Sequence, residues 1–394
     1  MREESNFLSL HNTRTEASGT SVAMLPSQYQ VRRRSGSEDE YDDGGFGNRP
    51  SRGGLASHQR PVGMQQPPLG LTGVICDSKT IAIPNRGSLH YTVFRPRHLR
   101  IKPPLVCIAG GPLLPCIYLQ PLVHQITDRS VIFFDAIGCG QSKLLLGHAP
   151  KERSHIPPVS AANIPDMVND FALLMRHLKV KDFHLLGHSF GGIIAYEWAK
   201  SHQAKLKQEP KANFCRSLIL VSTPVSISAA MQNSVNLQDA LREEHAGSSS
   251  IDVDNTSEVM AEFARIHECR LDPLPLPLQQ AFMGVFFSAS KGLAAVQHYN
   301  ALQPDTRISS TDDSNIGFPE TLIIRGEYDF VSTECQCDWV DILGSDVQFE
   351  TVGNSAHYSM LENEDEFAEI VRRFLPDPPE EDMIVLPNGV KVRR

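Results

Sequence analysis

A serine flanked by glycines lies at residues 187–191, where the sequence reads Gly-His-Ser-Phe-Gly. A continuous apolar run leads into this segment, and the small-residue helical pattern of residues 191–195 leaves it. A serine on such a strand-to-helix turn is held in strained backbone, and glycines are needed beside it because neighbouring backbone approaches too closely for a Cβ atom. The positive end of the helix would point at an oxyanion formed beside Ser189. The pattern predicts a nucleophilic serine; the alternative is an ordinary glycine-flanked turn.

A serine hydroxyl is a poor nucleophile at neutral pH and needs a base that is itself oriented by an acid. Asp329 follows the apolar run 321–324, and His357 follows the run 347–352. Taken singly, each has an ordinary explanation, because most of the 15 histidines and 46 acidic residues are expected to be solvated. Taken together, each follows a predicted strand, and they occur in the order Ser, Asp, His. We therefore predict a catalytic triad of Ser189, Asp329 and His357.

Acyl transfer also requires backbone N–H groups that stabilise the oxyanion. One is expected from Phe190, the residue after the predicted nucleophile. The second is expected from the loop at residues 109–112, which reads Ala-Gly-Gly-Pro and follows a predicted strand. Gly111 is the first choice for this second donor, and Gly110 is the second choice.

The elements that must position these residues alternate along the chain. Six apolar, β-branched runs are continuous rather than alternating, as is typical of strands buried on both faces of a parallel sheet. These runs are residues 104–109, 130–134, 183–186, 217–221, 321–324 and 347–352. A hairpin is predicted at 80–96, and helices at 164–178, 191–202 and 363–375. The alternation predicts an α/β fold with a mostly parallel central sheet, helices on both faces and right-handed crossovers.

Residues 224–317 break this rhythm, because they contain no convincing strand. Helical patterns occur there at residues 229–245, 256–268 and 277–303. A helical insertion after one strand of a regular sheet predicts a cap over the carboxyl edge of the sheet, where open α/β sheets bind their ligands. The core would then consist of residues 69–223 and 318–376.

The two ends of the chain differ from this core. Residues 1–68 are rich in Ser, Gly, Arg, Gln and Asn and show no sustained apolar periodicity. Such a composition cannot bury enough apolar surface to offset the entropy of ordering, so we predict a disordered N-terminal tail. Residues 377–394 are Pro-rich and charged at their start, and they are predicted to form a C-terminal tail.

Composition narrows the classes of partner. The 394-residue chain has a formal net charge of −9, so nothing in its charge favours nucleic acid or an anionic membrane as partner. No stretch approaches the roughly 18 consecutive apolar residues of a membrane span, and no signal-peptide pattern begins the chain. The eight cysteines are scattered through apolar segments, which predicts reduced thiols and a cytoplasmic location. Cys335 and Cys337 have no partner pair at zinc-site spacing, so neither a metal nor another cofactor is expected.

Four segments carry a family resemblance: GGP followed by YLQPL within 110–122, DAIGCGQS at 135–142, FARIHECRLDP at 263–273 and GEYDFVS at 326–332. With them, residues 70–376 resemble the α/β-hydrolase family and, within it, the proline iminopeptidase group of serine peptidases. The cap segment at 263–273 is the most specific of the four. The resemblance implies the α/β-hydrolase fold and the release of an N-terminal residue, often proline, from short peptides through an acyl-enzyme.

In this group of peptidases, carboxylates of the cap hold the free ammonium of the substrate. The resemblance therefore implies substrate-binding carboxylates here, and the candidates are Glu262, Asp272 and Asp305. The chain departs from the group at residues 299–307, which lack the glutamate of the corresponding segment, and at Ala109, where the group has histidine.

We therefore expect a serine hydrolase most similar to a proline iminopeptidase-type aminopeptidase, acting on short peptides or small molecules. An esterase or amidase on small acyl substrates is the first alternative, because the GHSFGG turn at 187–192 is more typical of those enzymes. A non-catalytic scaffold with a hydrolase fold is the second alternative, and the intact triad argues against it. The serine at position 189 excludes chemistry based on a nucleophilic aspartate. The sequence leaves the oligomeric state open.

Overall fold

The computed structural model describes residues 74–97, 102–145, 163–206, 214–247, 251–283, 296–303 and 318–375, together with the backbone of 383–385 and 391–393. The predicted N-terminal tail (1–68) and Asp305 lie outside the described residues.

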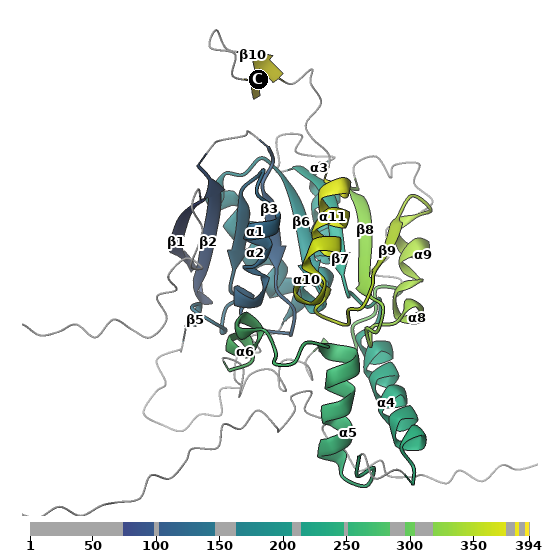
Figure 1. Cartoon of the computed structure of the whole chain (residues 1–394). Helices are drawn as coiled ribbons and strands as arrows, with labels where there is room; N and C mark the ends of the chain where they lie inside the picture. The colour runs from purple at the N-terminus through teal and green to yellow at the C-terminus, as the bar shows by residue number, and fades with distance from the viewer. Residues whose placement is uncertain are drawn as a thin grey trace, which may run out of the picture.

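A single large sheet forms the centre of the molecule, with the strand order β1-β2-β4-β3-β6-β7-β8-β9 (Figure 1). Strands β1, β2 and β4 pair antiparallel, and the sheet is parallel from β4 through β3, β6, β7 and β8 to β9. The short β5 pairs antiparallel with β2. The bounds are β1 Val74–Ile83, β2 Gly87–Pro96, β3 Leu105–Ile108, β4 Val131–Phe134, β5 Lys143–Leu144, β6 Asp182–His188, β7 Phe214–Val221, β8 Glu320–Gly326 and β9 Gln348–Val352. Every predicted apolar run is a strand, so the prediction of a mostly parallel α/β sheet is confirmed.

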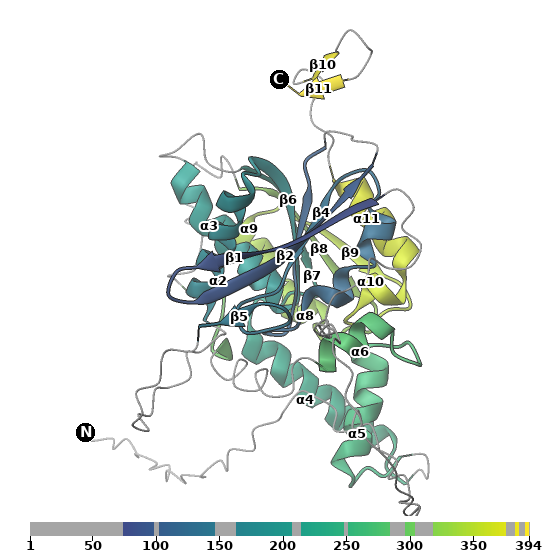
Figure 2. The same ribbon diagram turned by 90° about the vertical axis from the view of Figure 1, so that its left-hand side faces the viewer.

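Helices cover both faces of the sheet, which is why β3 and β4 are buried at every position. Figures 1 and 2 show α2, α3 and α9 on one face and α1, α10 and α11 on the other. The bounds are η2 Cys116–Leu119, α1 Leu122–Gln125, α2 Ile164–Leu178, α3 Phe190–Leu206, α8 Thr333–Gln336, α9 Trp339–Leu343, α10 Ser359–Glu362 and α11 Glu364–Phe374. Two apolar clusters, one on each side of the sheet, form the core.

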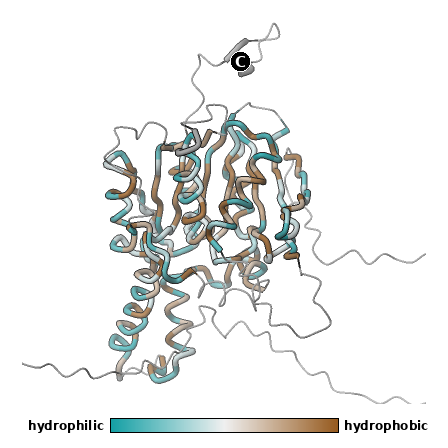
Figure 3. Tube along the Cα trace, turned by 180° about the vertical axis from the view of Figure 1, so that it is seen from behind, coloured by the Kyte–Doolittle hydropathy of each residue, from teal (hydrophilic) through white to brown (hydrophobic). Residues whose placement is uncertain are grey.

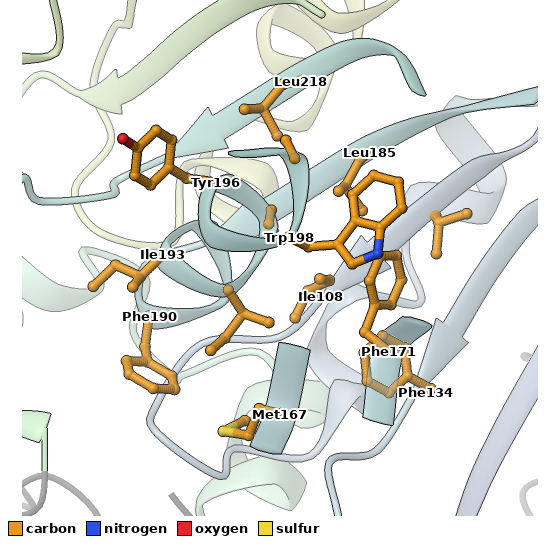
Figure 4. Packing of buried hydrophobic residues seen from close by; sticks show 14 of the residues in the cluster. Ile108, Phe134, Met167, Phe171, Leu185, Phe190, Ile193, Tyr196, Trp198 and Leu218 are labelled. Atoms are coloured by element: carbon orange, nitrogen blue, oxygen red, sulfur yellow. The ribbon is translucent and has the colours of Figure 1, made fainter. Parts of the chain in front are cut away.

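Aromatic side chains fix helix α3 against the sheet (Figure 4). Trp198 contacts the rings of Phe171 and Phe183, with centroid distances of 5.3 and 5.4 Å. Tyr196, two residues earlier on the same helix, lies 4.9 Å from the ring of Trp339. Burying each such side chain stabilises the fold by roughly 1.5–3 kcal/mol. Helix α3, which begins directly after the predicted nucleophile, is thereby held against β6 and the neighbouring helices α2 and α9.

Between β7 and β8 the chain leaves the sheet and forms α4 (Ile227–Glu244), α5 (Thr256–Phe263), the π-helical turn η3 (Ala264–Glu268) and α6 (Leu276–Met283). Figures 1 and 2 show α4 and α5 side by side beyond one end of the sheet, with α6 closer to it. Along α4 and α5 hydrophilic and hydrophobic positions alternate, whereas the strands are mostly hydrophobic (Figure 3). These helices lie within the segment for which we predicted a cap.

Three elements differ in detail from the predicted pattern. The first hairpin begins at Val74, earlier than the predicted residue 80. β1 is exposed or half-buried at every position except Ile83, so it gives a weaker apolar signal than the buried strands. The helix predicted at 256–268 ends in the π-helical turn η3, in which the Cys269 N–H donates to the Ala264 carbonyl at 2.9 Å. Within the predicted C-terminal tail, β10 (Met383–Val385) and β11 (Lys391–Arg393) form an antiparallel pair.

Candidate active site

Ser189 lies between the last residue of β6 and the first residue of α3, with a backbone φ of 53°. This left-handed conformation costs a residue with a Cβ atom about 1–2 kcal/mol, so the surroundings must hold it in place. Two backbone hydrogen bonds do so: the Ser189 N–H donates to the Val221 carbonyl at 2.7 Å, and the Gly192 N–H donates to the Ser189 carbonyl at 2.9 Å. The serine therefore occupies the strained strand-to-helix turn that the sequence predicted.

Close backbone contacts explain the glycines around this turn. A Cβ atom on Gly187 would lie 2.4 Å from the Gly191 carbonyl oxygen, and one on Gly191 would lie 2.4 Å from the Ile108 carbonyl oxygen. Gly192 was not singled out from the sequence, but a Cβ atom there would lie 1.9 Å from Thr223 Oγ1. No side chain fits at these positions unless α3 moves away from the sheet.

His357 and Asp329 form a buried pair at the carboxyl ends of β9 and β8. The distance from His357 Nδ1 to Asp329 Oδ1 is 2.9 Å, and Oδ1 also accepts the Val331 N–H at 2.9 Å. A carboxylate can only accept here, so the hydrogen bond assigns a proton to Nδ1 and leaves Nε2 of His357 able to accept one. This pairing gives the base and the acid the geometry that acyl transfer requires.

The loop that carries His357 is held by Glu362, a half-buried residue at the end of α10. Its Oε1 accepts the N–H groups of Ala356 and Tyr358, at 3.1 and 3.0 Å, and its Oε2 accepts the Arg270 N–H at 2.8 Å. Burial raises the pKa of this carboxyl, and the three N–H donors oppose the rise. Glu362 thus ties the histidine loop to the chain after η3. Sequence reasoning missed it, although an acid shortly after the predicted base is a visible signal.

Replacing Glu362 with alanine is expected to lower the free energy of unfolding by about 3 kcal/mol, because three backbone donors lose their acceptor. Urea denaturation measures this loss. The matched control is Glu369→Ala, which removes an exposed carboxylate from α11. A loss no greater than that of the control would contradict the assignment.

The predicted oxyanion donors lie beside Ser189. A Cβ atom on Gly110 would be 3.1 Å from Ser189 Cβ, so the glycine loop contacts the turn directly. The Gly110 N–H donates to the hydroxyl of Tyr118 at 2.8 Å and is therefore engaged. This favours Gly111, the first choice, which has a φ of 123°. Phe190 is the first residue of α3, so its N–H has no partner within the helix.

A cavity of about 320 Å³ lies between α4 and α5 and extends to Glu268. Its apolar lining comes from Met231, Val235, Met260 and Phe263, and its polar lining from Ser228, Gln232, Ser234, Gln238, Glu268, Gln297 and His298. Glu268 is the single acidic residue of this lining among the described residues. Burial raises the pKa of its carboxyl to about 7, and the nearby His357 opposes that rise.

Two contacts connect the cavity with the predicted base. The carbonyl of Glu268 accepts the N–H of His357 at 3.0 Å. The ring of Phe330 lies 4.4 Å from that of His357 and 6.1 Å from that of Phe263, which lines the cavity. Glu268 lies inside the segment 263–273 that carried the family resemblance, yet sequence reasoning did not select it.

Of the predicted substrate-binding carboxylates, Glu262 and Asp272 lie in described segments. Glu262 forms an ion pair with Arg265, whose Nε lies 2.7 Å from Glu262 Oε2, and this hydrogen bond lowers the pKa of the Glu262 carboxyl. Asp272 is exposed, and neither residue lines the cavity. Asp305 lies outside the described residues.

The eight cysteines all lie in described segments and are free thiols. Within the described ranges, no group of three His, Cys, Asp or Glu side chains is arranged to hold a metal ion. No helix in the same ranges is long and apolar enough to cross a membrane.

Residues 103–364 match the family model of the alpha/beta hydrolase fold. The match covers well over half of the chain, and the strand order and the serine turn described above agree with it. The protein belongs to the α/β-hydrolase family.

Within this family the chain is distantly similar to proline iminopeptidases. It is 25% identical to the proline iminopeptidase of Chitinophaga pinensis over 282 residues, which cover 69% of this chain and 89% of the relative. It is 27% identical to the proline iminopeptidase of Saccharolobus solfataricus over 286 residues, which cover 69% of this chain and 84% of the relative. The proline iminopeptidase of Lactobacillus acidophilus is 33% identical over 96 residues, which span only 24% of this chain and 29% of that protein.

Solved structures agree with the fold. The crystal structure of a proline iminopeptidase from Mycobacterium smegmatis superposes with a TM-score of 0.58 at 21% identity, over 76% of this chain and 97% of the other. At that identity the likeness concerns the fold alone.

Proposed function

We propose that this protein is a serine hydrolase that acts through an acyl-enzyme. The observation that carries the proposal is the left-handed turn at Ser189 together with the buried His357–Asp329 pair at the same edge of the sheet. Such an arrangement exposes a hydroxyl and supplies an oriented base, and together these make serine nucleophilic at neutral pH.

Each residue has a defined step in the proposed reaction. Ser189 Oγ attacks the substrate carbonyl while His357 Nε2 takes its proton and then delivers it to the leaving group. Asp329 keeps the proton of His357 on Nδ1 and stabilises the imidazolium. The N–H groups of Gly111 and Phe190 hold the oxyanion. Water then hydrolyses the acyl-enzyme by the same steps.

The finer proposal is an aminopeptidase that releases an N-terminal proline or similar residue from short peptides. Two observations support it: the distant similarity to proline iminopeptidases, and Glu268, the one acidic residue in the described lining of a cavity whose wall contacts His357. A substrate ammonium taken from water into this apolar space needs an opposite charge. Glu268 is placed to provide it, whereas Glu262 is already paired with Arg265.

The experiment compares prolyl-β-naphthylamide with its N-acetylated form as substrates. Glu268→Gln is expected to lower kcat/KM for the free amine about 100-fold, because the ammonium loses a desolvated partner, and to leave the acetylated compound nearly unchanged. The wild-type preference for the free amine should also rise as pH rises through about 7, where Glu268 loses its proton. Because both substrates are cleaved by the same triad, the ratio of their kcat/KM values isolates the effect of Glu268.

Glu262→Gln is the matched control, because it removes the charge of a cap glutamate that lies outside the cavity. If Glu262→Gln lost the preference for the free amine and Glu268→Gln kept it, the role of Glu268 would be contradicted. Glu262, which the sequence predicted, would then be the residue that binds the substrate ammonium.

An esterase or amidase acting on small acyl substrates is the second candidate. The observation in its favour is the apolar lining of the cavity, which suits a neutral acyl group as well as a side chain. Cleavage of p-nitrophenyl esters without turnover of either naphthylamide would establish this candidate in place of the aminopeptidase.

A further inference from the structure

Tyr118 and His188 belong to a buried chain of hydrogen bonds behind the turn at Ser189. The N–H of Gly110 donates to the hydroxyl of Tyr118 at 2.8 Å, and that hydroxyl lies 2.7 Å from His188 Nδ1. On the other side of the ring, His188 Nε2 lies 2.8 Å from the carbonyl oxygen of His357. These hydrogen bonds thus connect the glycine loop that follows β3 to the backbone of the predicted base, His357, which follows β9.

The partners fix the direction of every hydrogen bond. Because the Tyr118 oxygen accepts from the backbone of Gly110, its single proton is free to be donated to His188 Nδ1. Nδ1 must then be unprotonated, so the proton of the neutral ring lies on Nε2, where it meets a carbonyl that can only accept. Each group in the chain therefore donates toward His357.

The surroundings keep His188 uncharged. The residue is 1% exposed, and its ring centroid lies 4.9 Å from that of His357. Burial first, and the neighbouring His357 second, hold the pKa of His188 well below its usual range. A charge on this ring would oppose the imidazolium that His357 becomes during acyl transfer.

We propose that Tyr118 and His188 are positioning residues for acyl transfer, which hold the oxyanion loop and the base in register through this directed chain. The inference rests on the proposed function, because it takes Ser189 and His357 as the reacting pair. The side chains act through two backbone groups: the Gly110 N–H, next to the donor residue Gly111, and the His357 carbonyl. Misplacement of either reacting group should appear in kcat, because the substrate still binds but is held less often in a reactive geometry.

A purely structural role for Tyr118 is the competing explanation. Its ring packs against those of His188 and Tyr358, at centroid distances of 5.4 and 5.6 Å. Tyr118→Phe retains this packing and removes only the hydroxyl. The matched control is Tyr91→Phe, because Tyr91 is also a buried residue and its hydroxyl also lies next to a histidine, at 3.3 Å from His177 Nε2, but between β2 and α2.

The kinetic measurement uses whichever ester or amide the wild type cleaves. Tyr118→Phe is expected to lower kcat about 10- to 100-fold, with KM within about twofold and with no greater change in Tm than Tyr91→Phe. His188→Gln, whose amide can accept on one side and donate on the other, should retain more activity than the apolar His188→Leu. A kcat of Tyr118→Phe equal to that of the control, or equal losses in the two His188 variants, would overturn the proposal.

A second measurement does not depend on activity. Nitrogen-15 NMR of histidine-labelled protein at pH 7 is expected to show His188 neutral with its proton on Nε2, and Tyr118→Phe should move the Nδ1 resonance toward that of an unbonded imine nitrogen. A proton on Nδ1 would overturn the directed chain. If the wild type has no turnover that depends on Ser189, the proposed function fails, while this spectrum still confirms or overturns the chain.

Discussion

Ser189→Ala is expected to lower kcat/KM by roughly 10⁴-fold or more on any ester or amide that the wild type cleaves. Alanine keeps the Cβ atom and therefore preserves the left-handed turn, but it removes the hydroxyl oxygen that forms the acyl-enzyme in the proposed mechanism. Turnover of p-nitrophenyl acetate and of prolyl-β-naphthylamide by the purified protein measures the effect. Background hydrolysis by the oxyanion donors and the binding site limits the loss.

The control for this prediction is Ser201→Ala, which removes an exposed serine hydroxyl from the same helix, α3. It should leave turnover unchanged. A Ser189→Ala protein that keeps more than about a tenth of wild-type kcat/KM would show that the activity arises at another residue or in a contaminant.

Asp329→Asn is expected to lower kcat about 10⁴-fold with a small effect on KM. The asparagine fits the same space. Asp329 Oδ1 is the atom that accepts both the Nδ1 proton of His357 and the Val331 N–H, at 2.9 Å each. When the asparagine carbonyl takes this place, the negative charge that stabilises the imidazolium is lost. When its amide nitrogen takes this place, it donates to His357 Nδ1 and moves the imidazole proton to Nε2. The ring then has no free nitrogen to accept the proton of Ser189.

Comparison with Asp341→Asn separates this effect from the loss of a negative charge, because Asp341 is exposed on α9. Stopped-flow or steady-state kinetics should find the Asp341 variant unchanged. If Asp329→Asn lowered kcat by less than about tenfold, the histidine would not depend on Asp329 for its orientation.

The sequence predicted the central sheet well because its strands are buried on both faces. β3 and β4 consist entirely of buried positions and therefore read as continuous apolar runs. β1 is exposed or half-buried at all positions but one, so its residues form no continuous apolar run that would mark where the hairpin begins. The shared position of Ser189, Asp329 and His357 was also predictable, because each follows a parallel strand and the carboxyl ends of parallel strands meet at one edge of the sheet.

Details of the site that depend on side chains from other elements were not predictable. The choice between Gly110 and Gly111 depends on the hydroxyl of Tyr118, which reaches the loop from the turn η2. Glu268 was not singled out, and the position of its side chain depends on η3, whose π-helical geometry the helix predicted at 256–268 did not include. The i→i+5 hydrogen bond of η3 adds a residue to the turn, so the side chains beyond it face a different direction than an α-helix from 256 to 268 would give them.

The proposed function requires that Ser189 be an activated nucleophile. Treating the folded protein with a fluorophosphonate and mapping the adduct by mass spectrometry tests this without knowledge of the natural substrate. We expect one adduct, on Ser189, absent in Ser189→Ala, present in Ser201→Ala and formed much more slowly in Asp329→Asn. Failure of the folded wild type to react, or equal labelling of Ser189→Ala, would contradict the account.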